Sequence, residues 1–150
     1  MFPNIAAGIS VETRAIDAIA GKLLQALRES RDQMIGFILG GEVSGHTLAK
    51  SSVNTAILAT LIAGELRIPN HKILQITTGA LLHDVGMLKL PQDILEKQGG
   101  LSEGELQRIQ AHPLYAFKII CKELLYPEDV GVLALQHHER WDGDGYPRKI

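Results

Sequence analysis

Apolar residues recur along the chain at the three- and four-residue spacing that is typical of α-helices. In the first such segment, Ile16, Ile19, Leu23 and Leu27 follow this repeat, with Ser10 placed ahead of them as a helix cap. Residues 31–39 predict a shorter helix, because Gly40 and Gly41 follow directly and glycine commonly ends a helix. The start of the chain therefore predicts two consecutive helices.

The next segment predicts a long helix over residues 44–66 that is nearly apolar on every side between residues 53 and 63. A helix without a polar face belongs in the middle of a bundle. Pro69 breaks the run, and Asn70 can cap a further helix. The buried stripe of that helix contains Ile73, Leu74, Thr77 and Leu81, and it carries His83 and Asp84 near its C-terminal end.

The second half of the chain predicts a loop over residues 86–91 and then short helices. Ser102 and Glu105 have the spacing of a capping box, which predicts a helix running to about Ala111. His112-Pro113 starts another helix, in which Tyr115, Ile119 and Ile120 are expected to face inward. Pro127 opens the last helix.

In that last helix the inward positions are Val130, Leu133, Ala134 and His137. His138 then lies about 100° further around the same helix. No alternating strand pattern appears in the sequence. We therefore predict an all-α bundle of about six or seven helices.

Composition narrows the class of protein. A chain of 150 residues with 45% hydrophobic and 21% charged residues predicts a globular domain. The net charge of -2 argues against binding to a nucleic acid polymer. A single cysteine, Cys121, excludes an internal disulfide and predicts a small core side chain in a reducing compartment. No apolar run predicts a membrane segment or a signal peptide, so we expect a cytoplasmic location.

Five ionisable side chains are predicted at the inward ends of three helices. Any one of the histidines among them is, by itself, also explained as a hydrogen-bonded core histidine. Together, their burial would cost several kcal/mol unless each found a partner, and a divalent cation supplies one. Cores of helix bundles are common places for such sites. The predicted metal ligands are His83, Asp84, His112, His137 and His138.

Three segments, at residues 80–86, 112–113 and 137–147, resemble the HD-GYP domain, a branch of the HD metal-dependent phosphohydrolases. Residues 90–95 and 101–105 resemble it too, and the match runs from about Gly45 to the C-terminus. The resemblance implies an HD-domain-like bundle that is incomplete at its C-terminus. It also implies a bacterial signalling enzyme that hydrolyses a phosphodiester bond of cyclic di-GMP with metal-activated water.

The resemblance implies roles for individual residues. Asp84 would bridge metals, usually iron or manganese, with His83 as its catalytic neighbour. His112, His137 and His138 would complete the metal ligands. A final loop would border the site and contact partner proteins, and it contains Asp142, Gly143, Gly145, Tyr146 and Pro147. An ordinary tight turn is the alternative explanation of the loop residues.

The chain departs from the family pattern at several positions. Ser51 stands where a metal-binding histidine is expected, and His46 is too far around the helix to replace it. Met87 stands where the family has a lysine that meets phosphate, and Thr47 where some members place a metal-binding glutamate. The chain also stops at Ile150, before a later aspartate ligand. We therefore expect one metal at most, with weak or absent hydrolysis, and an apolar surface that a homodimer would cover.

Two functions stay open at this point. The first is a cyclic di-GMP phosphodiesterase, and the second is a degenerate module that binds a nucleotide or a protein partner. A phosphohydrolase of the broader HD group with another nucleotide substrate is a weaker third. In either case residues 1–43 are expected to form N-terminal helices that lead into an HD-GYP-like domain at residues 44–150.

Overall fold

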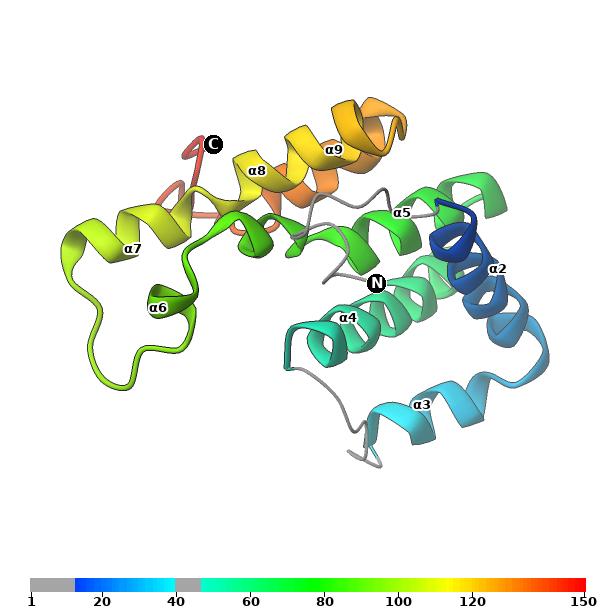
Figure 1. Cartoon of the computed structure of the whole chain (residues 1–150). Helices are drawn as coiled ribbons and strands as arrows, with labels where there is room; N and C mark the ends of the chain where they lie inside the picture. The colour runs from blue at the N-terminus through cyan, green and yellow to red at the C-terminus, as the bar shows by residue number, and fades with distance from the viewer. Residues whose placement is uncertain (1–12, 40–46) are drawn as a thin grey trace. The chain divides into compact units, whose positions relative to one another are not determined.

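The computed structural model describes residues 13–39 and 47–150 (Figure 1). The predicted cap Ser10, the residue His46 and the expected helix start at residue 44 lie outside the described residues. The described chain forms two compact units, residues 13–82 and residues 83–150. The predicted division at residues 43 and 44 concerns functional domains and stays a prediction.

The described residues form helices and no strand, so the predicted all-α class is confirmed. The first unit contains α2 (Thr13–Glu29), α3 (Arg31–Leu39), α4 (Thr47–Glu65) and α5 (Asn70–Leu82). The second contains η1, a 3-10 helix (Val85–Lys89), α6 (Gln92–Leu95), α7 (Glu103–Gln110), α8 (His112–Lys118), η2, a π-helix (Ile119–Glu123), and α9 (Glu128–Gln136). When the four-residue α6 is left out, the described residues form seven α-helices, in agreement with the expected number.

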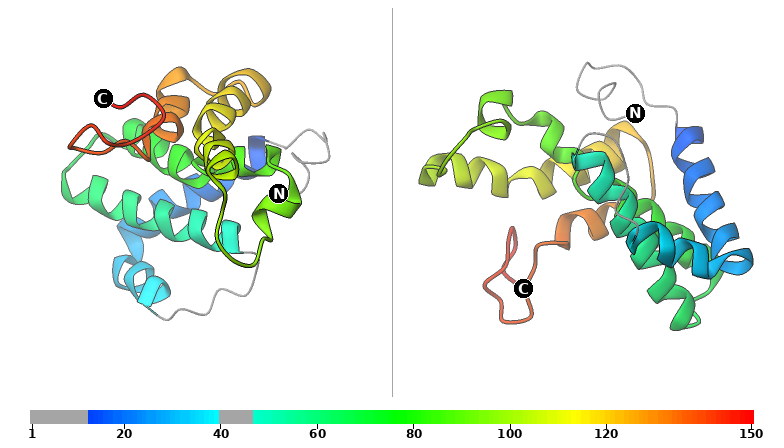
Figure 2. Two further views of the ribbon diagram at one scale, coloured as in Figure 1. Left: turned by 90° about the vertical axis from the view of Figure 1, so that its left-hand side faces the viewer. Right: turned by 90° about the horizontal axis from the view of Figure 1, so that it is seen from below.

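In the first unit, α4 lies along α5, and α2 packs against both (Figures 1 and 2). Ala56 on α4 is buried with Ala20 and Leu81, while Ile57 and Leu61 are buried with Met34 of α3. The opposite face of α4 is open, with Leu58 47% and Ile62 58% exposed. Within this unit, the neighbours of α4 therefore cover only one side of the helix.

In the second unit, α8 packs against α9 at a close approach that requires glycine. A Cβ at Gly131 would lie 2.3 Å from Cys121 Sγ and 2.9 Å from a ring carbon of Phe117. Burial raises the pKa of the Cys121 thiol, and the nearby charge of Glu128 adds to this effect. Ile119 and Ile120 are buried as predicted, but Tyr115 is 41% exposed and does not face inward. The contact between the two helices fixes the positions of the histidines at the start of α8 and the end of α9.

The segment predicted as a loop at residues 86–91 begins instead as the 3-10 helix η1, which packs against α8. Gly86 makes this contact possible. A Cβ at this position would lie 2.0 Å from the carbonyl oxygen of His112 and 2.6 Å from the backbone nitrogen of Ala116. Real Cβ atoms do not approach backbone this closely, so only glycine fits here. The result is that the residues just before η1 are held against the start of α8.

The predicted capping box at the start of α7 is confirmed. The Ser102 hydroxyl accepts a hydrogen bond from the Glu105 backbone N–H at 3.3 Å. The Glu105 carboxylate accepts from the Ser102 N–H at 2.7 Å and from Lys97 Nζ at 2.6 Å. These bonds satisfy two backbone donors that a helix N-terminus otherwise leaves to water.

We expect Glu105 to stay ionised at pH 4. The hydrogen bond from Lys97, followed by those from Ser102, lowers the pKa of Glu105 from 4.5 to about 2. Because the folded-state pKa is the lower one, the carboxylate stabilises α7 fully above pH 4.5, and this stabilisation is lost as the pH falls through about 2. The carboxyl 13C shift of Glu105 at pH 4 measures this directly. In Lys97→Ala the pKa should rise toward 4.5, and a protonated Glu105 at pH 4 in the unaltered chain would contradict the prediction.

None of the helices in the described part of the chain has the length and apolar character needed to cross a membrane.

Candidate metal centre

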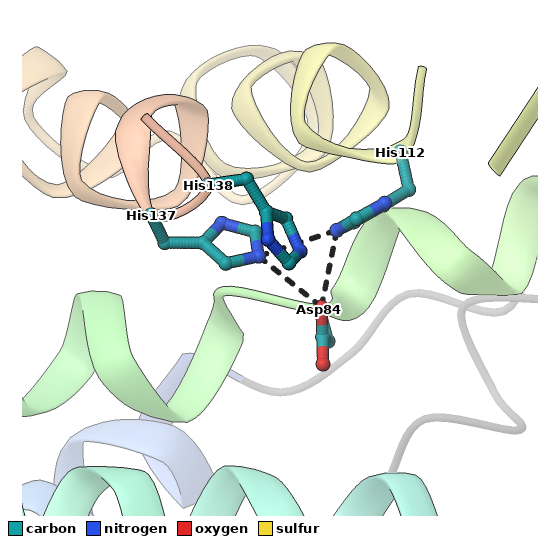
Figure 3. A group of neighbouring side chains, drawn as sticks. All are labelled: Asp84, His112, His137 and His138. Atoms are coloured by element: carbon teal, nitrogen blue, oxygen red, sulfur yellow. Dashed lines mark hydrogen bonds and ion pairs between the residues drawn. The ribbon is translucent and has the colours of Figure 1, made fainter. Parts of the chain in front are cut away.

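The backbone brings three segments of the second unit together at one point. His83 and Asp84 follow the end of α5 and precede η1. His112 is the first residue of α8, and His137 caps the C-terminus of α9, with His138 next to it. Figure 3 shows the three imidazoles pointing toward the Asp84 carboxylate from these two helix ends. The helix ends thus supply four side chains to one small volume.

The distances within this group are short. Asp84 Oδ1 lies 3.1 Å from His112 Nε2 and 3.4 Å from His137 Nε2. The two Nε2 atoms lie 3.2 Å apart. With His138 included, one ligand atom from each of the four residues lies within 4.8 Å of the others. Among the described residues, this is the one group of His, Cys, Asp and Glu side chains arranged so that it could hold a metal ion.

Hydrogen bonds on the far side of two rings orient the nitrogens that face the centre. His112 Nδ1 lies 2.7 Å from the carbonyl oxygen of Ile109, and His137 Nδ1 lies 2.7 Å from that of Ala134. A carbonyl only accepts, so each Nδ1 carries the proton and donates it. In the neutral rings, each Nε2 therefore presents a lone pair toward the centre.

Three acceptors then face one another with no donor between them: the two Nε2 lone pairs and Asp84 Oδ1. Such an arrangement is repulsive unless a proton or a metal cation lies between the acceptors. Imidazole nitrogen and carboxylate oxygen suit divalent transition metals, and an Nδ1–H bonded to a carbonyl is the usual support of a metal-binding histidine. The side chains present therefore fit a divalent metal.

The electrostatics of the group agree with this reading. Burial raises the pKa of Asp84, but the rings of His112, His137 and His83, which donate hydrogen bonds to the carboxylate when they are protonated, outweigh burial, so the net pKa lies well below its usual range. Burial, followed by the charges of His137 and His112, lowers the pKa of His138 to about 4. At neutral pH the carboxylate is therefore charged and the His138 ring is neutral, which are the forms that bind metals.

His83 lies on the other side of the carboxylate. Its Nε2 is 3.1 Å from Asp84 Oδ2, whereas His112 and His137 approach Oδ1. The His83 ring also meets the His137 ring edge-on, with centroids 4.9 Å apart. Sequence reasoning placed all five side chains in one set of ligands. The structure brings them all together but divides them between the two carboxylate oxygens.

The final loop returns to the centre through Tyr146. Its ring is stacked on the His138 ring, with centroids 4.5 Å apart and planes at 20°. Burial raises the pKa of Tyr146, and the charge of Asp84 adds to this effect. Asp142 is paired with the Arg140 guanidinium and accepts from the Asp144 N–H at 3.1 Å, while Gly143 has a positive φ of 77°. Gly145 is buried, and Pro147 follows Tyr146 through a cis peptide bond.

Comparison with known proteins places this centre in a family. The family model described as HD domain matches residues 17–150. The chain belongs to the HD domain family. The resemblance to its HD-GYP branch, predicted from the sequence, agrees with the named relatives that match the chain.

A cyclic di-GMP phosphodiesterase, PdeB, of Borreliella burgdorferi is 37% identical over 99 residues, which cover 66% of this chain and 26% of that protein. A 3'3'-cGAMP-specific phosphodiesterase 3 of Vibrio cholerae is 39% identical over 103 residues, covering 68% of this chain and 22% of that protein. A cyclic di-GMP phosphodiesterase of Vibrio cholerae is 31% identical over 149 residues, covering 93% of this chain and 28% of that protein. The chain thus spans about a quarter of the length of the curated relatives that it matches.

The departures from the family pattern lie at described positions, except for one side chain. In this HD domain Ser51 is an exposed residue of α4, and Met87 is a half-buried residue of η1. The Thr47 side chain lies outside the described part of the structure. A serine hydroxyl and a thioether are weak metal and phosphate ligands, respectively, compared with imidazole and ammonium.

Sequence reasoning missed two residues that shape the centre of this HD domain, Gly86 and Glu139. It placed Tyr146 in the loop that borders the site but did not predict that the Tyr146 ring stacks on His138. The glycine directly after His83-Asp84-Val85 was a signal of close backbone approach. Glu139, directly after His137-His138, binds the backbone of the final loop. Its position beside two candidate ligands was the only signal.

Proposed function

We propose that residues 83–150 hold one divalent metal and that the chain acts on the phosphodiester bond of a cyclic dinucleotide. The observation that carries the proposal is the convergence of Asp84 Oδ1 with the Nε2 atoms of His112 and His137, beside His138. Three acceptors at this spacing, without a donor between them, support a cation at the point where they meet.

The proposed ligands are Asp84, His112, His137 and His138, and the proposed metal is iron or manganese. Both metals accept mixed imidazole and carboxylate ligands. When bound, such a metal supplies a Lewis acid that lowers the pKa of water and offsets the negative charge of a phosphate. The backbone carbonyls of Ile109 and Ala134 hold two of the rings for this purpose through their Nδ1–H groups.

His83 is the proposed catalytic neighbour of Asp84. With a proton on Nε2, His83 donates to Asp84 Oδ2 at 3.1 Å and fixes the plane of the carboxylate, so that Oδ1 stays directed at the other histidines. No third histidine, cysteine or acidic side chain in the described residues joins His83 and Asp84 in a second group of this kind. This supports one metal per chain.

The proposed substrate class follows from the relatives. Their printed names give two substrates, cyclic di-GMP and 3'3'-cGAMP, and both are cyclic dinucleotides joined by phosphodiester bonds. The shared chemistry is the ring of two nucleotides, so the proposal is made for this class and the test includes both molecules.

A second function, a nucleotide- or protein-binding module without turnover, is favoured by Met87 and Ser51. Neither carries the charge or imidazole that the family pattern has at these positions. The final loop also presents Trp141 fully exposed, and exposed tryptophan is enriched at protein interfaces. In this alternative the partner contacts residues 141–147, and a second copy of the chain is one such partner.

The test is hydrolysis of cyclic di-GMP and of 3'3'-cGAMP with Mn²⁺, or with Fe²⁺ under anaerobic conditions, beside a His83→Ala variant. Turnover that disappears in the variant supports the enzyme. Binding of either nucleotide without turnover supports the second function. If the chain shows no turnover and no binding, that result contradicts the proposal of a cyclic dinucleotide ligand. Elemental analysis of protein purified without chelators should give one metal per chain, and two tightly held metals would contradict the single centre.

A further inference from the structure

His138 is held differently from the other two histidines of the centre. His112 and His137 each donate Nδ1–H to the carbonyl three residues earlier. In the described part of the chain, the His138 ring has no such carbonyl partner, and its neighbours are aromatic rings. Something other than a hydrogen bond must therefore fix the direction of its nitrogens.

The Tyr146 ring is in the right place to do so. It lies nearly parallel to His138, with centroids 4.5 Å apart and planes at 20°. The His112 ring lies at 88° to the His138 ring, with centroids 5.1 Å apart. A ring covered on its face by one aromatic neighbour and met edge-on by another loses most of its freedom to rotate.

Hydrogen bonds to backbone groups of the final loop hold Tyr146 in this place. The Tyr146 N–H donates to the carbonyl of His138 itself at 3.2 Å. The Glu139 carboxylate accepts from the backbone N–H of Arg148 at 2.6 Å and from that of Ile150 at 3.2 Å. One side chain thus ties down the backbone that follows Tyr146, directly beside the residue that Tyr146 covers.

Gly145 allows the loop to lie this close. A Cβ there would be 2.4 Å from the backbone nitrogen of Arg140 and 2.6 Å from the carbonyl oxygen of His138. The loop therefore rests directly on the backbone of residues 138–140. The contact between the two rings depends on this close approach and on the bonds of Glu139.

We propose that Tyr146 is a positioning residue for His138, and that Glu139 keeps Tyr146 in position by binding the backbone of Arg148 and Ile150. The stacked ring replaces, for His138, the carbonyl bond that orients His112 and His137. This inference rests on the proposed metal centre and concerns how one of its ligands is held.

The first test compares Tyr146→Leu, Tyr146→Phe and the control Tyr115→Leu by calorimetric titration of Mn²⁺ into the metal-free chain. Loss of a residue that orients a metal ligand typically weakens metal affinity 10–100-fold, so Tyr146→Leu should bind about 10-fold more weakly. Tyr146→Phe keeps the ring and should restore affinity to within about twofold. Tyr115 is exposed on α8, and its replacement should leave the affinity unchanged.

The second test separates the effect of the hydrogen bonds that Glu139 makes to the backbone from the effect of its negative charge. Glu139→Ala and Asp144→Ala both remove one negative charge from the same part of the chain, but only Glu139 binds the loop backbone. Glu139→Ala should weaken Mn²⁺ binding about as much as Tyr146→Leu, and more than Asp144→Ala. If circular dichroism shows that Tyr146→Leu fails to fold, the comparison of Glu139→Ala with Asp144→Ala tests the proposal instead, since the His138 and Tyr146 rings remain in both variants.

Wild-type affinity in Tyr146→Leu, or equal losses in Tyr146→Leu and Tyr146→Phe, would overturn the positioning role of the ring. Equal losses in Glu139→Ala and Asp144→Ala would overturn the role of Glu139. An unaltered chain that binds no Mn²⁺, Fe²⁺ or Co²⁺ would overturn the proposed function itself, and this outcome is distinct from the others.

Discussion

Replacing Asp84 with asparagine is expected to abolish tight metal binding while the helices remain folded. The amide keeps the shape of the carboxylate but not its charge, and its nitrogen cannot act as a ligand in place of an oxygen. Asp84 Oδ1 is the atom that faces both His112 Nε2 and His137 Nε2, at 3.1 and 3.4 Å. Replacing a residue that merely supports a ligand lowers metal affinity about 10–100-fold. Loss of the ligand itself should therefore lower the affinity for Mn²⁺ at least about 100-fold.

The measurement is calorimetric titration of Mn²⁺, with far-ultraviolet circular dichroism to follow helix content. Asp93→Asn is the matched control, since it makes the same change at an exposed residue of α6 outside the centre. The control should bind as the unaltered chain does. Binding by Asp84→Asn within about threefold of the unaltered chain would show that the carboxylate is not a ligand.

The elements that the sequence predicted well are those whose cause is local. The capping box at Ser102 and Glu105 needs only two side chains three residues apart, and the start of α9 after Pro127 needs only the fixed φ of proline. The meeting of Asp84 with three histidines was also predictable, because ionisable groups on inward helix ends need partners. For the starts of α7 and α9, the pattern and its physical cause lie within a few residues of each other.

The features that the sequence did not predict depend on contacts between segments far apart in the chain. The 3-10 helix η1 is five residues long, too short for a hydrophobic repeat to distinguish it from a loop. The division of the histidines between Oδ1 and Oδ2 of Asp84 is set by how η1 rests on α8, and spacing along the chain does not contain it. The final loop is held by bonds from Glu139 to the backbone, which leave no periodic trace in the sequence.

Gly86→Ala is the substitution from which we expect the largest loss of both stability and metal binding in the second unit. The added methyl group would lie 2.0 Å from the carbonyl oxygen of His112 and 2.6 Å from the backbone nitrogen of Ala116. Both obstacles are backbone atoms of α8, so no side chain can rotate away. Overpacking of this kind costs about 1–3 kcal/mol, and a contact with backbone should lie at the upper end of that range.

Thermal unfolding of the metal-free chain measures the first effect. A loss of about 3 kcal/mol corresponds to a midpoint lower by about 6–12 °C for a chain of this size. Gly104→Ala is the matched control, because a Cβ at this position of α7 meets nothing within 4 Å. There, alanine should be neutral or stabilising by up to about 1 kcal/mol, since it favours helix more than glycine does.

The second effect separates a local clash from a role in the centre. Asp84 lies two residues before Gly86, and His112 carries the carbonyl that the new methyl group would strike. Relief of the clash must therefore move Asp84 and His112 apart, so Gly86→Ala should bind Mn²⁺ at least about 10-fold more weakly even at temperatures where it is folded. A destabilised variant with unchanged Mn²⁺ affinity would mean that the ligands move together, and that Gly86 serves packing alone.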